Sequence, residues 1–308
     1  MIRISFIFFL VLNSLNCFAQ SSFQKAQEKY ESKNYNDAIR ILDKLITVND
    51  KDTQSYFLRG KCHFEMRTVQ KSYNDFSKYI ELDPSNSLAY LYRGNILEGT
   101  EQFFDAINDY NAAIKYGKDT VITSGYFHRG SCYLSVNNKK QAYNDLWVSY
   151  QRNPKDRDIR LNFGTILCDM DSIEKGLVIF KELIREDKND CIACQNIGYF
   201  SMLDKQYDTA LVYFNRTLDI NPKMALTYNN RGFLKHKMNN DKEAIKDINT
   251  SLKLDKSNPF AYKNRAVVFI AQGKIEEACA DLIKARSLGF AEKYGNEVNL
   301  LIQQYCNK

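Results

Sequence analysis

The sequence has few residues that interrupt helices. It contains only 4 prolines and 13 glycines among 308 residues, and no Ser- or Gly-rich stretch divides it. Because these two residue types favour turns and end helices, their scarcity argues against many short strands and favours continuous helical structure. The sequence also lacks any run of five or more Lys and Arg, although its formal net charge is +6. A charge this diffuse argues against the concentrated basic patch of a nucleic-acid-binding protein.

Catalytic motifs are absent as well. The chain has no glycine-rich phosphate-binding loop, no H-E-x-x-H and no G-x-S-x-G sequence. Its three histidines, His63, His128 and His236, have no obvious partner, and the C-x-x-C of Cys191 and Cys194 has no second pair. Zinc sites need three or four ligands of these types. We therefore expect no metal site, no cofactor and no enzymatic activity.

One apolar run lies at the N-terminus. Residues 4–12 are almost entirely apolar but too few to span a bilayer, and the small residue Ala19 offers a site for signal-peptidase cleavage. We therefore predict that residues 1–19 are a signal peptide and that the mature chain is periplasmic or secreted. The alternative is a lipoprotein acylated at Cys17, which Asn16 fits poorly because it is not small and apolar. No second apolar run is long enough to span a membrane.

Small residues recur along the chain at a fixed spacing. Six glycines lie 34, 36, 34, 34 and 34 residues apart, and the spacing extends to Ala26 and Ala266. Twelve residues after each of these eight positions is another small residue, and four further on is a large apolar one. Helices packed as an antiparallel hairpin need small residues where their backbones approach and large ones beside them. The pattern therefore predicts eight helix hairpins. The glycines are Gly60, Gly94, Gly130, Gly164, Gly198 and Gly232.

The ends of the repeats add a second signal. Pro84, Pro154 and Pro222 close the second helix of three repeats, because proline cannot continue a helix. The 34-residue spacing, with its small, aromatic and proline positions, resembles the pattern of the tetratricopeptide repeat family. The resemblance covers about residues 20–289. It implies an all-α, right-handed α-solenoid whose first helices line a concave groove, and it implies a protein-binding role.

The segment after the last repeat has a different pattern. Its apolar residues fall on one face of a helix: Val298, Leu301, Ile302 and Tyr305. A terminal repeat would otherwise expose its apolar side, so an amphipathic helix is expected to cover it. We therefore predict a repeat array of eight hairpins at residues 20–290 and one capping helix at residues 291–308.

A set of three residue types occurs together in five repeats. A Tyr, an Arg three residues later and an Asp sixteen residues after the Arg occur in repeats 2, 3, 4, 7 and 8. We predict an Arg–Asp ion pair between the two helices, beneath the Tyr ring. Five copies spaced along a solenoid argue for a structural role rather than a catalytic one. The sets are Tyr56, Arg59, Asp75; Tyr90, Arg93, Asp109; Tyr126, Arg129, Asp145; Tyr228, Arg231, Asp247; and Tyr262, Arg265, Asp281.

Repeats 5 and 6 lack this set. Phe163 and Ile179 replace the ionic pair in repeat 5, and Ile197 and Tyr213 replace it in repeat 6. An apolar pair is the physical alternative to an ion pair at a buried position. We therefore predict apolar packing at these two sites.

The cysteines allow two predictions about disulfides. Cys279 lies in the last second helix and Cys306 ends the predicted cap, so a bridge between them would attach the cap to the array. Cys191 and Cys194 could form a local structural bridge. They could also form a redox pair, because a helix N-terminus lowers thiol pKa values.

The family resemblance implies which first-helix positions face the groove. In the N-terminal half many of them are apolar, and we predict that this stretch anchors an extended peptide or helix. The alternative is that these side chains only pack between neighbouring first helices. In the C-terminal half, Gln195, Asn229 and Lys263 make one row polar. The predicted partner-binding residues are Phe57, Phe64, Leu91, Phe127, Leu134 and Leu161.

A row of asparagines occupies a neighbouring frame position. It lacks the matching lysines of the carboxylate clamp that some family members use, so that clamp is not predicted. The row consists of Asn162, Asn196, Asn230 and Asn264.

The resemblance thus implies a scaffold or adaptor that binds a protein or peptide partner, and no nucleic acid. Two alternatives stay open. A thiol-disulfide redox protein would use Cys191 and Cys194 on the repeat scaffold. A fixed accessory subunit of an envelope complex would hold one partner permanently in its groove.

Overall fold

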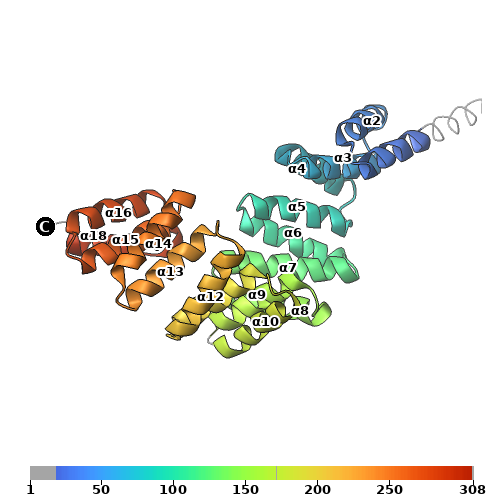
Figure 1. Cartoon of the computed structure of the whole chain (residues 1–308). Helices are drawn as coiled ribbons and strands as arrows, with labels where there is room; N and C mark the ends of the chain where they lie inside the picture. The colour runs from blue at the N-terminus through green and yellow to red at the C-terminus, as the bar shows by residue number, and fades with distance from the viewer. Residues whose placement is uncertain (1–18, 171, 307–308) are drawn as a thin grey trace, which may run out of the picture. The chain divides into compact units, whose positions relative to one another are not determined.

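The computed structural model describes residues 19–170 and 172–306. Within these ranges every regular element is a helix, which confirms the all-α prediction (Figure 1). No described helix is long and apolar enough to cross a membrane. Residues 1–18 of the predicted signal peptide, Cys17 among them, lie outside the described residues, whereas residues 19–31 are helical.

The chain divides into two compact units, Met1–Ile159 and Arg160–Lys308, which we call the N-terminal and C-terminal units. In the N-terminal unit, the helix at residues 19–31 packs its Ala26 against Ala38 and Leu42 of the next helix. The helices that follow are α2 (Tyr35–Val48), α3 (Thr53–Glu65), α4 (Val69–Leu82), α5 (Ser87–Gly99), α6 (Phe103–Tyr116), α7 (Asp119–Ser135) and α8 (Lys139–Arg152).

The C-terminal unit continues the same alternation of first and second helices. Most of α9 belongs to it, and two further helices follow its last hairpin. Its helices are α9 (Arg157–Asp169), α10 (Ile173–Glu186), α11 (Cys191–Leu203), α12 (Tyr207–Ile220), α13 (Ala225–Lys237), α14 (Asp241–Leu254), α15 (Pro259–Ala271), α16 (Ile275–Ser287), α17 (Phe290–Tyr294) and α18 (Glu297–Tyr305).

Short polar side chains begin many of these helices. The Asp190 carboxylate accepts a hydrogen bond from the backbone N–H of Ala193, and Asn258 does the same for Ala261. Such caps satisfy backbone donors that have no partner inside the helix. The turn inside a hairpin also repeats, because it contains one residue with a positive φ in most repeats. These residues are Lys33, Arg67, Glu101, Asn137, Lys205, Asn239 and Gly273.

The glycine row is where the two helices of a hairpin approach most closely. A Cβ atom at Gly94 would lie 2.7 Å from Cε1 of Tyr110, and one at Gly198 would lie 2.7 Å from Cδ1 of Phe214. The large apolar residue of each second helix therefore packs directly on the glycine or alanine of the first helix. All eight of these large side chains are 0% exposed, which confirms the hairpin pattern: Leu42, Phe76, Tyr110, Leu146, Phe180, Phe214, Ile248 and Leu282.

The predicted amphipathic capping helix is present as α18, and one further short helix, α17, precedes it. Gly295 separates α17 from α18 and has φ +100°, a conformation that ends a helix and that glycine adopts without strain. Phe290, Val298 and Ile302 are buried against the last hairpin. The cap therefore covers the apolar side of the terminal repeat.

Candidate functional site

A cavity of about 470 Å³ opens in the C-terminal unit. It is lined by residues of α9, α11, α13 and α15, the first helices of four consecutive repeats. Carboxamide side chains from three of these helices form a polar strip along it. We call this site the asparagine groove, and its amide residues are Gln195, Asn196, Asn229, Asn230 and Asn264.

Three of the amides form a directed chain of hydrogen bonds. Asn264 Nδ2 donates to Asn229 Oδ1 at 3.0 Å, and Asn229 Nδ2 donates to Asn230 Oδ1 at 3.1 Å. This pattern orients the three amides relative to one another. It leaves Asn230 Nδ2 and Asn264 Oδ1 without a hydrogen bond to any described residue. The chain of three amides therefore offers a donor at one end and an acceptor at the other to a ligand.

Apolar side chains flank this polar strip. Tyr199, Leu203 and Leu226 line the groove and are 38%, 52% and 45% exposed. Phe233 and Phe260 also contribute to the lining. Exposed apolar side chains gathered around a hollow are typical of a binding surface, because a ligand that covers them removes apolar surface from water, which lowers the free energy.

The charged residues that line the groove are Lys263 and Asp169. Lys263 Nζ donates to Glu297 Oε1 at 3.2 Å and lies 5.4 Å from the Phe233 ring centroid. The Lys263 side chain is 11% exposed, so most of its length is packed between aromatic rings. Its ammonium group is thus held by Glu297.

The Tyr, Arg and Asp of each predicted set lie together in all five repeats. The Arg Nε and Nη2 atoms donate to the two carboxylate oxygens of the Asp at 2.6 to 2.9 Å. The Arg Cζ atom lies 5.2 to 5.7 Å from the Tyr ring centroid. This arrangement joins the two helices of a hairpin through two parallel hydrogen bonds.

A third contact of these arginines escaped the sequence analysis. Arg231 Nη1 donates to Asn215 of the preceding repeat at 2.8 Å, and Arg265 Nη1 donates to Asn249 at 2.7 Å. The signal was present, because a polar residue lies sixteen or eighteen positions before each of the five arginines. The acceptors are Asp43, Ser77, Asn111, Asn215 and Asn249. Each arginine therefore also links neighbouring repeats.

Comparison with known proteins shows what these repeats are similar to. The profile of the tetratricopeptide repeat matches residues 225–258, which contain α13 and α14. A tetratricopeptide repeat protein structure from Parabacteroides merdae superposes with a TM-score of 0.72 at 17% identity, covering 83% of this chain and 99% of that one. Residues 225–258 thus match the tetratricopeptide repeat family, and the chain has the fold of a tetratricopeptide repeat protein. Proteins of this family generally mediate contacts between proteins and are typically not enzymes.

Curated relatives are distant in sequence. A TPR repeat-containing protein of Methanocaldococcus jannaschii is 20% identical over 83% of this chain and 48% of its own length. Stress-induced-phosphoprotein 1 of Caenorhabditis elegans is 24% identical over 64% of this chain and 60% of its own length. The chain thus spans about half of the curated relatives that it matches.

Two of the predicted groove residues of this repeat array take part in an aromatic cluster. The ring centroid of Phe57 lies 5.9 Å from that of Tyr92, and Phe64 lies 5.4 Å from the same ring. Phe76 stacks on Tyr92 from the core side. Phe57 and Phe64 are half-buried, so packing between neighbouring repeats occupies much of their surface.

The other predicted groove residues do not gather into one site. Phe57 and Phe127 line separate cavities of the N-terminal unit. Leu91 and Leu134 are half-buried. Leu161 is only 8% exposed and packs in the core of the C-terminal unit with Leu177. The prediction that Leu161 lines the groove was therefore wrong, whereas an anchoring role of the exposed surfaces of Phe57 and Phe127 stays a prediction.

Cys191 and Cys194 do not form the predicted local bridge. Both are free thiols, and Cys194 is 0% exposed because its side chain packs against Ile197 and Phe180 in the core. Burial raises the pKa of Cys194, whereas a reactive thiol needs a lowered one. No group of three or more potential metal ligands occurs in the described part of the chain.

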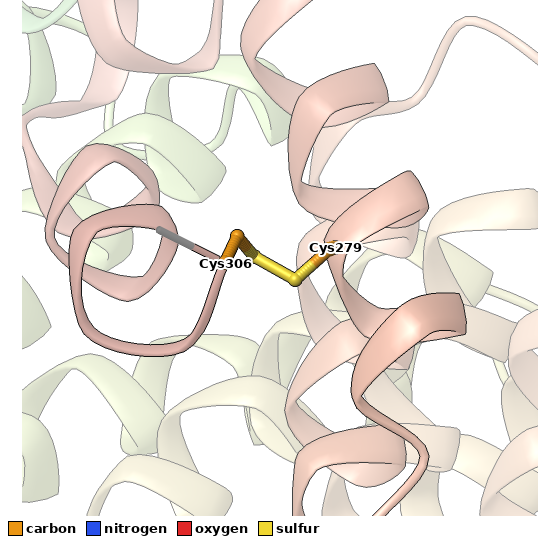
Figure 2. Close-up of a disulfide and its surroundings, with 2 residues drawn as sticks. All are labelled: Cys279 and Cys306. Atoms are coloured by element: carbon orange, nitrogen blue, oxygen red, sulfur yellow. A yellow bond between two sulfur atoms is a disulfide. The ribbon is translucent and has the colours of Figure 1, made fainter. Parts of the chain in front are cut away.

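The predicted pairing of Cys279 with Cys306 is present as a disulfide (Figure 2). It joins α16 to the residue after α18, with 5.6 Å between the two Cα atoms.

Repeats 5 and 6 are apolar where the Arg–Asp pairs are missing. Phe163, Ile179 and Ile197 are 4%, 7% and 0% exposed.

Proposed function

We propose that this chain is a protein-interaction scaffold that binds an extended peptide segment of a partner in the asparagine groove. The directed amide chain carries this proposal, because it leaves the Asn230 donor and the Asn264 acceptor facing a ligand. An extended peptide presents C=O and N–H groups along its length, and each needs a partner when it leaves water. The Asn230 donor can pair with one backbone C=O of the peptide, and the Asn264 acceptor can pair with one backbone N–H.

The apolar flank supports the same ligand class. Side chains of an extended peptide alternate between two sides, so a segment whose backbone lies on the amides would direct one side chain toward Tyr199, Leu203 and Leu226. Apolar or aromatic side chains fit there, because they would cover surface that is now exposed. The expected ligand is therefore an extended segment with an apolar anchor.

We further propose that the chain is exported. The apolar run at residues 4–12 supports this, and so does the Cys279–Cys306 disulfide, since such bonds persist in oxidising compartments. Mass spectrometry of the protein from fractionated cells would show a mature chain that begins at Gln20. A full-length chain in the cytosolic fraction would overturn the proposal, and a diacylated Cys17 would replace it with the lipoprotein alternative.

Peptide selection tests the groove directly. A random-peptide library displayed on phage would be selected against the oxidised protein, and the affinity of the selected peptide would be measured by fluorescence polarisation. Removing one hydrogen-bonding amide costs roughly 1.4 kcal/mol, so Asn230→Ala and Asn264→Ala should each weaken binding about ten-fold.

Asn189→Ala provides the matched control, because Asn189 is exposed and does not line the groove. Its affinity for the selected peptide should equal that of the wild type. Two results would place the site outside the asparagine groove. One is unchanged peptide binding by both groove variants, and the other is binding that is weakened only by substitutions at Phe57 and Phe127.

A further inference from the structure

The C-terminal cap supports one end of the asparagine groove. Phe260, which lines the groove, has its ring centroid 4.5 Å from that of Tyr294 in α17 and 5.1 Å from that of Phe290. Lys263, which also lines the groove, donates to Glu297, the first residue of α18. The positions of two lining side chains therefore depend on where the cap lies.

Apolar packing and one covalent bond attach the cap to the last hairpin. Helix α17 has 5 residues and α18 has 9, and helices this short are not stable on their own. Gly289 and Gly295 flank α17 with φ +80° and +100°. Because glycine has no Cβ atom, the backbone on both sides of α17 has more conformational freedom than it would with other residues. Besides the packing of Phe290, Val298 and Ile302, the covalent bond from Cys306 to Cys279 holds the cap.

This bond is less enclosed than most of the free thiols. Cys279 and Cys306 are both half-buried, whereas Cys62, Cys132, Cys168 and Cys194 are buried free thiols. The cap disulfide therefore lies nearer the surface than these four thiols.

We propose that the Cys279–Cys306 disulfide is a redox latch that sets the ligand affinity of the asparagine groove, an inference that rests on the peptide-binding function proposed above. With the bond intact, the cap holds Phe260 and Lys263 in the positions that complete the groove. With the bond reduced, α17 and α18 detach more readily. Phe260 then loses its two aromatic neighbours and Lys263 loses Glu297.

The opening reaction is a thiol–disulfide exchange with a dithiol. One thiolate of the dithiol attacks a cysteine sulfur, forms a mixed disulfide and releases the other cysteine as a thiolate. The second thiolate of the dithiol then displaces the remaining cysteine. The dithiol is oxidised to its disulfide, and the two electrons and two protons end on Cys279 and Cys306.

The test measures the affinity of the full-length protein for the peptide selected from the random library. It compares the oxidised protein with protein treated with dithiothreitol. Cleavage of the bond would be verified by mass spectrometry after thiol alkylation. Coupling between a regulatory element and a binding site is typically five-fold or more, so reduction should weaken binding by at least about five-fold. Reoxidation should restore it. Unchanged affinity after verified cleavage would overturn the latch.

The Cys279→Ser, Cys306→Ser double variant separates this effect from general reduction. It should bind the peptide as weakly as the reduced wild type, and dithiothreitol should change it no further. Hydrogen–deuterium exchange gives a readout without any ligand. Reduction should increase exchange in α18 and in α15 around Lys263, but not in α11.

The two proposals fail in different ways. If selection against the oxidised protein yields no peptide sensitive to Asn230→Ala, the peptide-binding function fails, and the exchange measurement alone decides whether the cap supports the groove. If the peptide binds the groove but neither its affinity nor the exchange in α15 responds to reduction, only the latch fails.

Discussion

Arg129 on α7 donates to both carboxylate oxygens of Asp145 on α8, at 2.6 and 2.7 Å. The Asp145 side chain is 6% exposed and that of Arg129 is 18% exposed, so both charges have lost most of their water. The same Arg also donates to Asn111 of the preceding repeat at 2.6 Å. One side chain therefore joins the two helices of a hairpin and links that hairpin to its neighbour.

Removing one partner of this pair should be costly. Asp145→Ala leaves the Arg129 charge without its counter-ion, which for a buried pair costs roughly 3–5 kcal/mol, and the partial exposure of Arg129 favours the lower end. Urea unfolding followed by circular dichroism should show a clearly lower midpoint. The chain also provides the matched control, because repeat 5 uses Phe163 and Ile179 at these positions. An Arg129→Phe, Asp145→Ile double variant should regain most of the stability, and a double variant no better than Asp145→Ala would contradict the apolar-swap interpretation.

The close approach at Gly94 gives a second prediction. Gly94→Ala places a Cβ atom 2.7 Å from the buried ring of Tyr110, and such overpacking costs roughly 1–3 kcal/mol. Gly99→Ala is the control on the same helix, because nothing lies within 4 Å of its Cβ position. Alanine is the better helix former, so Gly99→Ala should leave the thermal midpoint unchanged or raise it. Equal effects of the two changes would show that α5 and α6 do not meet at Gly94.

The buried thiols predict a loss of stability at alkaline pH. Burial raises the pKa of Cys62 to about 11 and that of Cys132 to about 12. In the unfolded chain these thiols ionise near pH 9, whereas in the folded chain they stay protonated. The unfolded state therefore binds fewer protons above pH 9, and stability falls as pH rises toward 11, by about 1.4 kcal/mol per pH unit for each thiol.

Chemical unfolding at several pH values between 8 and about 11 would check this sign. A Cys132→Ala variant should be less stable at neutral pH, because it leaves a small cavity, but its stability should depend less steeply on alkaline pH. A slope equal to that of the wild type would show that Cys132 ionises in the folded state.

Much of the fold was predictable because it repeats. The interval between the glycines and the residues twelve and sixteen positions later depend only on local helix geometry and on the packing of one hairpin. The Arg–Asp pairs could be recognised because their residues appear and disappear together in the same repeats. The apolar replacements at Phe163 and Ile197 followed from the same comparison.

The binding site was harder to predict from the sequence. Half-buried apolar residues such as Phe57 were expected to face a partner, but neighbouring repeats cover much of them. The amide rows were visible, yet their role depended on distances between first helices of different repeats. Only the structure shows that Asn264, Asn229 and Asn230 form one directed chain with a free atom at each end.

The sequence by itself determined the hairpins of this protein, since a spacing of small, large and paired residues is a local property that each repeat must satisfy. The tertiary structure decided what happens between repeats and at the end of the array. Gly295 divides the cap into two helices, and Cys194 points into the core instead of toward Cys191. Lys263 meets Glu297, 34 residues away along the chain. These contacts join segments that belong to different helices. The sequence separation of two such residues does not determine whether their helices turn the same faces toward each other.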